Sequence, residues 1–261
     1  MKQILLSYMR SKSLQPIWVK LHHLSLMGMN HWGAASTSHS GELHALEYMK
    51  SKLLTNDATN IFDVGANVGQ YATMVSQMFG HQSKIYSFEP SKATFRKLQE
   101  NVSNISNISF YNIGMGAKKE TLKLYSSGFG STIASVYNLH NPINEFKEEY
   151  MEEIDLTTID AFCRENDIQS IDILKIDIEG HELYALEGAC QLLANKAIRF
   201  IQFEFSECNI DSRTFFRDFF TLLEHYNLYR IVSNGLYPIS EYTESLEVFH
   251  TANYLAELKT V

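Results

Sequence analysis

Four side chains next to two predicted strand ends have the chemical types needed to take a proton from a hydroxyl group. Asp177, Glu179 and His181 occur in KIDIEGHE, and Glu204 interrupts the apolar run FIQFEFS. Carboxylates and imidazoles are common general bases. A carboxylate buried in an apolar strand costs on the order of several kcal/mol unless it is paired or has a function. We therefore predict that these four residues orient or deprotonate a substrate.

Each of the four also has a structural alternative. Lys175 could pair with Glu204 within the sheet. Asp177 or Glu179 could cap the helix predicted to follow them, because acids suit a helix N-terminus. His181 could be an ordinary hydrogen-bonded histidine. The same oxygens and imidazole could hold a divalent cation, but the spacing D-x-E-x-H is not diagnostic, so the metal remains unknown.

A second motif, NIFDVGANVGQY at 60–71, has a buried strand before two glycines and a helical pattern after them. Gly65 and Gly69 allow a sharp turn and close approach of a ligand to the backbone. Glu89 lies 20 residues past Gly69, at the end of the next predicted strand. A carboxylate at that place accepts hydrogen bonds from ribose hydroxyls. Loop and acid together predict a nucleoside site formed by Gly65, Asn67, Gly69 and Glu89.

The loop residues narrow the choice of nucleotide. Asn67 and Gln70 stand where the dinucleotide fingerprint G-x-G-x-x-G has its second and third glycines, which disfavours a pyrophosphate and hence a dehydrogenase. No G-K-[ST] follows, so a phosphate-binding P-loop is excluded. S-adenosylmethionine remains as the common adenosine ligand. Asp63 would meet its ammonium group or an ordered water, and the loop N–H groups its carboxylate.

Several segments in chain order resemble the FkbM family of methyltransferases: FDVGANVGQY at 62–71, FEP at 88–90, LKIDIEGHELYALEGA at 174–189 and FEF at 203–205. The resemblance implies a Rossmann-like class I methyltransferase fold and S-adenosylmethionine as methyl donor. It also implies O-methylation of a hydroxyl on a saccharide, such as a cell-surface glycan, or on a natural product. Asn112 and Ile113 would contact the adenine, although NIGMGAKKE departs from the family pattern there. Tyr71 and Asp177 are included in the cofactor site.

Alternating strand and helix patterns predict an α/β domain over 42–261, with a mostly parallel seven-stranded sheet covered on both faces. Expected strands cover 60–64, 84–89, 107–113, 170–177 and 198–206, with two more near the C-terminus. Expected helices cover 42–53, 69–79, 91–102, 181–195 and 212–226. Residues 114–160 break this rhythm and are interpreted as an inserted substrate-side segment.

Residues 1–41 form a separate extension whose apolar residues have helical spacing: Leu14, Ile17, Trp18, Leu21 and Leu24. We expect this helix to pack on the main domain, with a loop after it. The alternatives are a substrate lid or a membrane-interface helix that carries Trp18.

Composition limits the partners. A net charge of -8 argues against a nucleic-acid-binding surface, and no apolar run is long enough to span a bilayer. The three cysteines are widely spaced and form no zinc pattern, which favours a reducing, cytoplasmic setting. A small molecule or glycan is the expected acceptor, and Phe129, Tyr137 and Tyr237 could stack on sugar rings. The oligomeric state is not predicted.

Two other classes remain as alternatives. One is a methyltransferase that acts on protein or nucleic acid, although the Asn/Asp-Pro-Pro-aromatic stretch of base methyltransferases is replaced by IDIEG. The other is a non-catalytic nucleotide-binding module of the same fold. Such a module would keep the glycine loop but would not need the polar cluster at Asp177 and Glu204.

Overall fold

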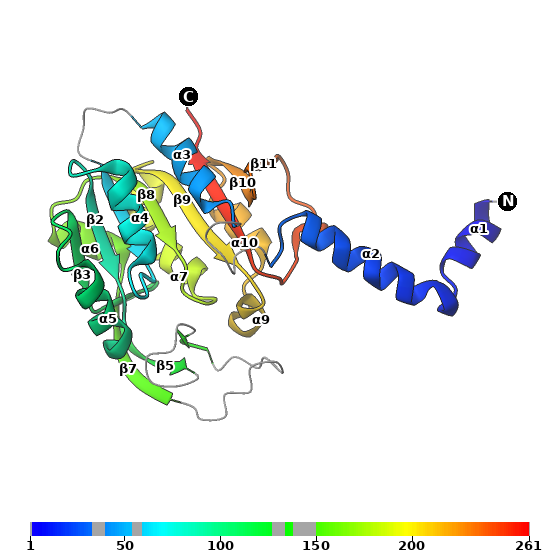
Figure 1. The fold of residues 1–261 in the computed structure, drawn as a ribbon, viewed down its shortest axis with the longest axis horizontal. Coiled ribbons are helices and arrows are strands. Elements are labelled where there is room, and N and C mark those ends of the chain that lie inside the picture. Colours follow the sequence, from blue (N-terminus) through cyan, green and yellow to red (C-terminus); the bar gives the residue numbers. More distant parts are fainter. Residues whose placement is uncertain (1, 33–39, 54–58, 127–133, 138–149, 261) are drawn as a thin grey trace.

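The core of the protein is an eight-stranded sheet in the order β11-β10-β12-β9-β8-β1-β2-β3 (Figure 1). The computed structural model describes residues 2–32, 40–53, 59–126, 134–137 and 150–260. The strands of this sheet are β1 Asn60–Val64, β2 Lys84–Phe88, β3 Ile108–Tyr111, β8 Ile171–Ile176, β9 Ile198–Phe205, β10 Tyr226–Val232, β11 Gly235–Ile239 and β12 Ala252–Leu258.

The strand directions confirm the α/β class and correct the sheet. Strands β3, β2, β1, β8 and β9 are parallel to their neighbours, whereas β12 runs antiparallel to both β9 and β10. The eighth strand, β11, pairs with β10 as a hairpin in which Val232 faces Gly235. The sequence Asn234-Gly235 is a strong turn signal that would have predicted this hairpin. The sheet is therefore mixed and has one strand more than expected.

Helices cover both faces of the sheet, which explains why its central strands are apolar on both sides. Helices α3 Glu42–Lys52, α4 Gln70–Phe79 and α5 Lys92–Val102 contribute to one buried cluster. Helices α6 Ile159–Glu165, α7 Glu182–Glu187, α8 Cys190–Ala194 and α10 Phe216–Leu222 contribute to the other. The Ser91 hydroxyl accepts a hydrogen bond from the Thr94 N–H and caps α5, as the sequence predicted.

Two helix predictions were too long. The helix expected over 181–195 is divided into α7 and α8, because Gly188 lies against the main chain: a Cβ on it would be 2.1 Å from the Gly116 carbonyl oxygen. The Asp160 carboxylate then accepts hydrogen bonds from the N–H groups of Gln191 and Leu192 at the start of α8. The helix expected over 212–226 begins at Phe216 and follows a short helix, α9 Cys208–Ser212.

The inserted segment forms a second sheet in the order β4-β7-β5-β6. Its strands are β4 Gly114–Met115, β5 Glu120–Ser126, β6 Ala134–Ser135 and β7 Tyr150–Thr157. Leu124, Ile154 and Leu156 are buried together on one face of this sheet, as alternating strands allow. This sheet therefore provides an apolar wall beside the main domain.

The N-terminal segment is an arm made of α1 Lys2–Met9, the 3-10 turn η1 Lys12–Leu14 and α2 Gln15–Gly28. Figure 1 shows the arm extending away from the sheet, with the N-terminus at its far end. Leu26 is the buried side chain of α2, so the expected packing of this helix on the domain is wrong. Across the described ranges, no helix is both long and apolar enough to cross a membrane.

Candidate active site

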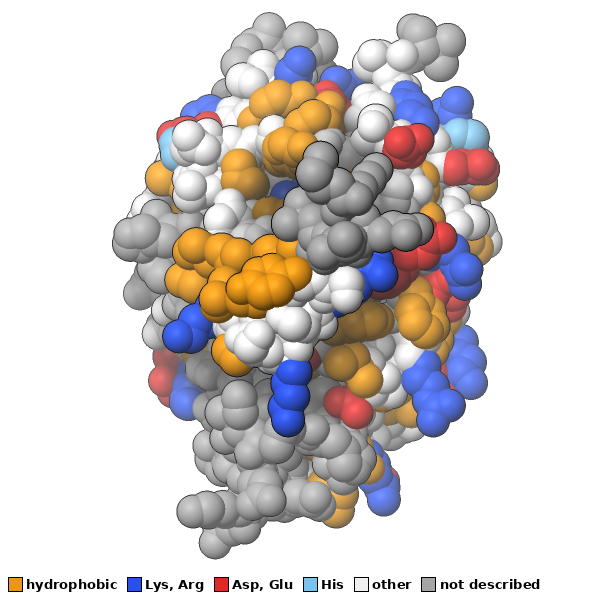
Figure 2. Space-filling view, turned by 90° about the vertical axis from the view of Figure 1, so that its right-hand side faces the viewer, with side chains coloured by type: hydrophobic (Ala, Val, Ile, Leu, Met, Phe, Trp, Pro, Cys, Tyr) orange, Lys and Arg blue, Asp and Glu red, His pale blue; other side chains and the backbone are white. Residues whose placement is uncertain are grey.

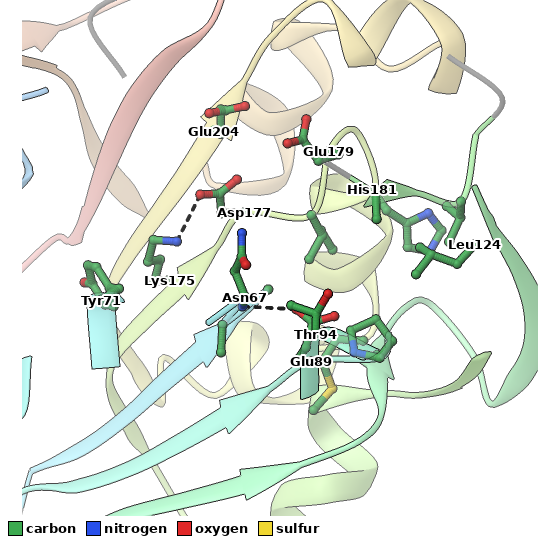
Figure 3. A pocket seen from close by; sticks show the side chains of 18 of the residues that line it. Asn67, Tyr71, Glu89, Thr94, Leu124, Lys175, Asp177, Glu179, His181 and Glu204 are labelled. Atoms are coloured by element: carbon green, nitrogen blue, oxygen red, sulfur yellow. Dashed lines mark hydrogen bonds and ion pairs between the residues drawn. The ribbon is translucent and has the colours of Figure 1, made fainter. Parts of the chain in front are cut away.

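A cavity of about 770 Å³ lies where β1, β2, β8 and β9 end, which is the place where parallel sheets bind ligands. Its volume is within the range of roughly 300–1,000 Å³ typical of small-molecule sites. Figure 3 shows polar side chains from the strand ends around it. Predicted site residues that line it are Gly65, Asn67, Tyr71, Glu89, Asp177, Glu179, His181 and Glu204.

The glycine loop is held by the backbones of two neighbouring strands. The N–H groups of Gly65 and Ala66 both donate to the Phe88 carbonyl oxygen, at 3.0 and 2.9 Å. Gly65 has φ +83°, and a Cβ on it would lie 1.9 Å from the Asp177 carbonyl oxygen. Both the left-handed conformation and the close approach require glycine here. The turn predicted from the sequence and the tertiary packing against Asp177 therefore both explain why position 65 is glycine.

Glu89 ties the loop to the end of β2. Its Oε2 accepts a hydrogen bond from the Asn67 N–H at 3.0 Å, and its Oε1 accepts one from the Ser91 N–H at 2.8 Å. Burial raises the pKa of Glu89 to about 7, although these two bonds oppose the shift. Each carboxylate oxygen can accept a further hydrogen bond. Glu89 thus has the capacity that two ribose hydroxyls require.

Lys175 is the cation of the site, and its partner differs from the predicted one. Its Nζ donates to Asp177 Oδ2 at 3.1 Å and lies 4.0 Å from Asp63 Oδ1, rather than pairing with Glu204. The β1–β8 register places Asp63 opposite Lys175. Burial lowers the pKa of Lys175, but the carboxylates of Asp177 and Asp63 outweigh that effect and raise it overall. Lys175 therefore stays charged and neutralises this part of the cavity.

Glu204 and Glu179 lie at the end of the cavity away from Glu89 (Figure 3). No described residue donates a hydrogen bond to the Glu204 carboxylate. Burial, followed by the charges of Asp177 and Glu179, raises its pKa well above the usual value. Glu179 has φ +53° and accepts a hydrogen bond from Cys208 Sγ at 3.2 Å. Burial, followed by Asp177, raises the pKa of Glu179 to about 7, in the range suited to a general base.

His181 faces the same cavity from the other side. Its Nδ1 lies 2.9 Å from the Tyr137 hydroxyl, and its ring stacks on Tyr184 at 4.8 Å between centroids. Its Nε2 is buried and has no hydrogen-bond partner among the described residues. Burial lowers the pKa of His181 to about 4, so the imidazole is neutral at physiological pH. Tyr137 is one of the three aromatic residues that could stack on a sugar, and in the structure its hydroxyl contacts His181.

The turn that carries Asp177 and Glu179 is held by Glu182, a residue that the sequence reasoning did not single out. One oxygen, Glu182 Oε1, accepts hydrogen bonds from the N–H groups of Ile178 and Gly180 at 2.9 and 3.2 Å. Neither Asp177 nor Glu179 caps α7, so the capping alternative is wrong for both. Glu182 is the last acid of KIDIEGHE, and its place in the first turn of a helix was the available signal.

Four predicted cofactor residues do not line the cavity. Asp63 is fully buried near Lys175. A Cβ on Gly69 would lie 2.7 Å from a Val102 methyl group, so this glycine lets α4 start close to α5. The Asn112 side chain donates to the carbonyl oxygens of Glu89 and Pro90, and Ile113 packs against the core. These residues support the loop and the strand ends.

The other two aromatic residues that could stack on a sugar are Tyr237 and Phe129. Tyr237 lies on β11 with its ring 5.4 Å from the Arg230 guanidinium, and it does not line the cavity. Phe129 lies outside the described residues.

Some residues that line the cavity could not be predicted from the sequence, because they come from segments far apart in the chain. Trp32 comes from the base of the arm, and its backbone N–H donates to the Thr251 carbonyl oxygen at 2.8 Å. The Thr251 hydroxyl in turn donates to Glu207 Oε2 at 3.1 Å. Glu42 accepts a hydrogen bond from the Gln202 amide at 2.9 Å.

The cavity is consequently rich in carboxylates. Within the part of the chain that the structure covers, no group of three or more His, Cys, Asp or Glu side chains has the geometry to hold a metal ion.

Comparison with known proteins identifies the family. The model for the methyltransferase FkbM domain matches residues 63–231. The chain therefore belongs to the FkbM methyltransferase domain family, as the sequence motifs predicted. Methyltransferase 1 of Beauveria bassiana is 26% identical over 147 residues, covering 51% of this chain and 59% of that protein.

Two further relatives have more specific names. The 2-O-methyltransferase NoeI of Sinorhizobium fredii is 22% identical over 157 residues, covering 56% of this chain and 63% of that protein. The hexuronic acid methyltransferase AglP of Haloferax volcanii is 23% identical over 134 residues, covering 51% of each. The chain thus matches less than two thirds of the length of each relative.

Family membership agrees with the predicted class, a methyltransferase domain, and the cavity has features that an S-adenosylmethionine molecule would need. Gly65, Asn67 and Tyr71 line the cavity, and Glu89 offers acceptors for a ribose. Met115, Leu156 and Pro90 supply apolar surface for an adenine.

Proposed function

We propose that the protein is an S-adenosylmethionine-dependent O-methyltransferase whose acceptor is a hydroxyl group of a saccharide or related natural product. The observation that carries this proposal is one continuous cavity with two different ends. Its Gly65–Glu89 end matches a nucleoside, and its Glu179–Glu204 end presents two carboxylates that form no ion pair with any described residue. A module that merely bound a nucleoside would not need the second end.

The cofactor end would be formed by Gly65, Asn67 and Glu89, with Tyr71 and Asp177 nearby. When bound, S-adenosylmethionine supplies an electrophilic methyl group on a sulfonium, so the protein does not need to activate the leaving group. Asp177 already faces Lys175, so its carboxylate is held in one orientation. The remaining task of the chain is to position the acceptor and accept its proton.

Proton removal falls to the other end of the cavity. Glu204 receives no hydrogen bond from any residue that the structure describes, and its pKa is raised, so its ionised form is a stronger proton acceptor than an ordinary glutamate carboxylate. Glu179 beside it has a pKa of about 7, so a proton taken by Glu204 can be shared within the pair. We assign Glu204 as the general base and Glu179 as its proton-sharing partner.

His181 is suited to orienting the acceptor. With a pKa of about 4 it remains neutral, so it is a weak base but a good hydrogen-bonding group. In the tautomer with the proton on Nδ1, that nitrogen donates to the Tyr137 oxygen, and Nε2 presents a lone pair to the cavity. A sugar hydroxyl could then donate to Nε2 while a neighbouring hydroxyl faces Glu204.

The relatives support a saccharide acceptor, since one is named as a 2-O-methyltransferase and another as a hexuronic acid methyltransferase. At 22 to 23% identity they support the class of acceptor and leave the particular sugar open. The apolar wall of Leu124, Ile154 and Leu156 is available to the cofactor base or to the acceptor's ring faces.

The test is calorimetry of the purified chain with S-adenosylmethionine and with NAD, followed by methyl transfer to a saccharide panel. We expect S-adenosylmethionine to bind and NAD not to bind. Binding of NAD alone would overturn the cofactor. Methylation of a protein or nucleic acid, with none of the saccharides, would keep the cofactor and overturn the acceptor.

A further inference from the structure

The arm formed by α1, η1 and α2 exposes most of the large apolar side chains that the described residues leave in solvent. The exposed set within the arm is Leu6, Tyr8, Met9, Ile17, Trp18, Val19, Leu21, Leu24 and Met27. Elsewhere the set is Leu43, Met151, Ile210, Phe215 and Tyr237, which are spread over separate elements. A contiguous apolar surface of this kind normally binds a protein or a membrane.

The helical spacing of the arm gathers these side chains along α2. Leu14, Ile17, Leu21 and Leu24 recur every three or four residues and so share one face of the helix. Val19 and Met27 are 65% and 56% exposed on other faces, so the helix is apolar around much of its circumference. The indole N–H of Trp18 donates to the Met9 carbonyl oxygen at 2.7 Å and joins α2 to α1. The two helices therefore form one continuous apolar arm.

The charge of the arm is opposite to that of the rest of the chain. Residues 1–41 contain four basic residues, Lys2, Arg10, Lys12 and Lys20, and no Asp or Glu. Residues 42–261 therefore carry a formal net charge of −12, within the total of −8. Figure 2 views the molecule from the side on which the arm protrudes and shows hydrophobic and Lys/Arg side chains on that surface. The acidic residues are thus confined to the rest of the chain.

A lipid surface fits this combination better than a second copy of the chain. Two arms packed together would place four cations on each side with no carboxylate to pair them. An arm packed on the domain of a second copy would need an apolar counterpart there, but the exposed apolar side chains of the described domain residues are scattered. An anionic bilayer offers apolar depth and negative headgroups at the same place.

The length of the arm accommodates the negative charge of the domain. The 14 residues of α2 span about 21 Å, which exceeds the Debye length of about 10 Å at 0.1 M salt. Repulsion between the acidic domain and an anionic surface is therefore largely screened when the far end of the arm is bound. Lys20 lies beside the apolar face, where its stem can be buried while its ammonium reaches the headgroups.

We propose that residues 2–28 are a membrane-docking arm that lies in the interface of an anionic lipid surface through Ile17, Leu21 and Leu24, with Lys12 and Lys20 at the headgroups. The arm adheres to the surface without crossing it. Docking would hold the catalytic domain next to acceptors carried at a membrane. This proposal does not depend on the proposed methyl transfer, because the arm is distinct from the carboxylate end of the cavity.

The experiment is co-sedimentation of the full chain with vesicles of equal parts phosphatidylcholine and phosphatidylglycerol, and with phosphatidylcholine alone. We expect binding to the mixed vesicles that weakens as salt is raised. Leu21→Glu should weaken binding by roughly thirtyfold or more, because the variant loses the free energy gained by burying one leucine side chain in the lipid. Its matched control is Leu43→Glu, since these leucines are 48% and 44% exposed on helices, and the control should bind like the wild type.

A second pair of variants tests the charge. Lys20→Glu should weaken binding to the mixed vesicles by about tenfold, whereas Lys84→Glu, an exposed lysine on β2, should have no effect. Vesicle binding that is absent, or equally strong in Leu21→Glu and Leu43→Glu, would overturn the proposal. A dimer in sedimentation equilibrium that Leu21→Glu dissociates, with no vesicle binding, would assign the arm to a second copy instead.

Discussion

At the Gly65 end of the cavity, the loop N–H groups and the Glu89 carboxylate are hydrogen-bonded, whereas the Glu204 carboxylate and His181 Nε2 at the other end have no hydrogen-bond partner among the described residues. Glu89 accepts two backbone N–H bonds, and the loop N–H groups donate to Phe88. By contrast, Glu204 and His181 Nε2 receive no such bonds, and the pKa of Glu204 is raised well above its usual value. The first end is preorganised by the fold, and the second is left for a ligand to complete.

The difference suggests how the two ends respond to substitution. Changes at the preorganised end should damage both cofactor binding and stability, because the same bonds serve both. Changes at the carboxylate end should lower turnover while leaving the fold intact or more stable, since unpaired buried charges destabilise the folded state.

The largest effect is expected for Gly65→Ala. The new Cβ would lie 1.9 Å from the Asp177 carbonyl oxygen, and the φ of +83° adds strain, so we expect a loss of about 3 kcal/mol or more in unfolding free energy. Gly80→Ala is the matched control, with φ +73° and no atom near the new Cβ, and should lose about 1 kcal/mol. Urea denaturation measures both. Equal losses would show that the contact with Asp177 is unimportant.

Glu204→Gln should lower kcat by about 10²- to 10³-fold, because the general base is removed. The dissociation constant for S-adenosylmethionine should be unchanged. Glu207→Gln is the control, since Glu207 lines the same cavity but accepts a hydrogen bond from Thr251. Steady-state kinetics with calorimetry separates turnover from binding. Full activity of the Glu204 variant would remove it from the catalytic role.

Glu89→Ala should weaken S-adenosylmethionine binding by about 10²-fold, because the ribose acceptors and the Asn67 and Ser91 anchors are lost together. It should also lower the unfolding free energy by about 1 kcal/mol for the same reason. Glu89→Gln keeps one acceptor oxygen, so it should lose less cofactor affinity and less unfolding free energy than Glu89→Ala. Calorimetry that finds unchanged affinity in Glu89→Ala would show that the ribose contact is wrongly placed.

The pH dependence of stability tests the carboxylate end directly. The folded pKa of Glu179 is about 7, above its ordinary value of 4.5, so protonation favours the folded state. That stability is fully present below pH 4.5 and is lost as pH rises through 7. Glu179→Gln should therefore stabilise the protein by about 1–2 kcal/mol at pH 8 and by little at pH 4.5. Thermal unfolding of the exposed control Glu100→Gln should show no such difference.

The smallest effect is expected for Tyr137→Phe. Its hydroxyl lies 2.9 Å from His181 Nδ1, so its removal frees the ring without removing a group that contacts the acceptor. We expect about a tenfold rise in the KM of the acceptor and unchanged cofactor affinity. Kinetics at saturating S-adenosylmethionine would show this, and an unchanged KM would leave His181 without an orienting role.

Features determined by short-range pattern could be predicted from the sequence. Strand 60–64 and the helix capped by Ser91 were found at their observed bounds, because apolar periodicity and a capping residue are local signals. Gly65 and Glu89 were found because their roles follow from a strand, a turn and a fixed separation.

Features that depend on strand register or on long-range packing could not be predicted from the sequence. The pairing of Lys175 with Asp177 required knowledge of which side chains the strands bring together. Trp32 and Thr251 reach the cavity from segments more than 200 residues apart, and nothing in either segment indicates the other. The outward course of α2 was also missed, since its apolar spacing is equally compatible with packing on the domain.

The most direct test of the two-ended cavity is mass spectrometry of a saccharide panel incubated with S-adenosylmethionine and either the wild type or Glu204→Gln. We expect the wild type to add one methyl group to a sugar oxygen, and the variant to bind the cofactor but transfer the methyl group at least about a hundredfold more slowly. Equal transfer by both proteins would contradict the assignment of the carboxylate end to the acceptor.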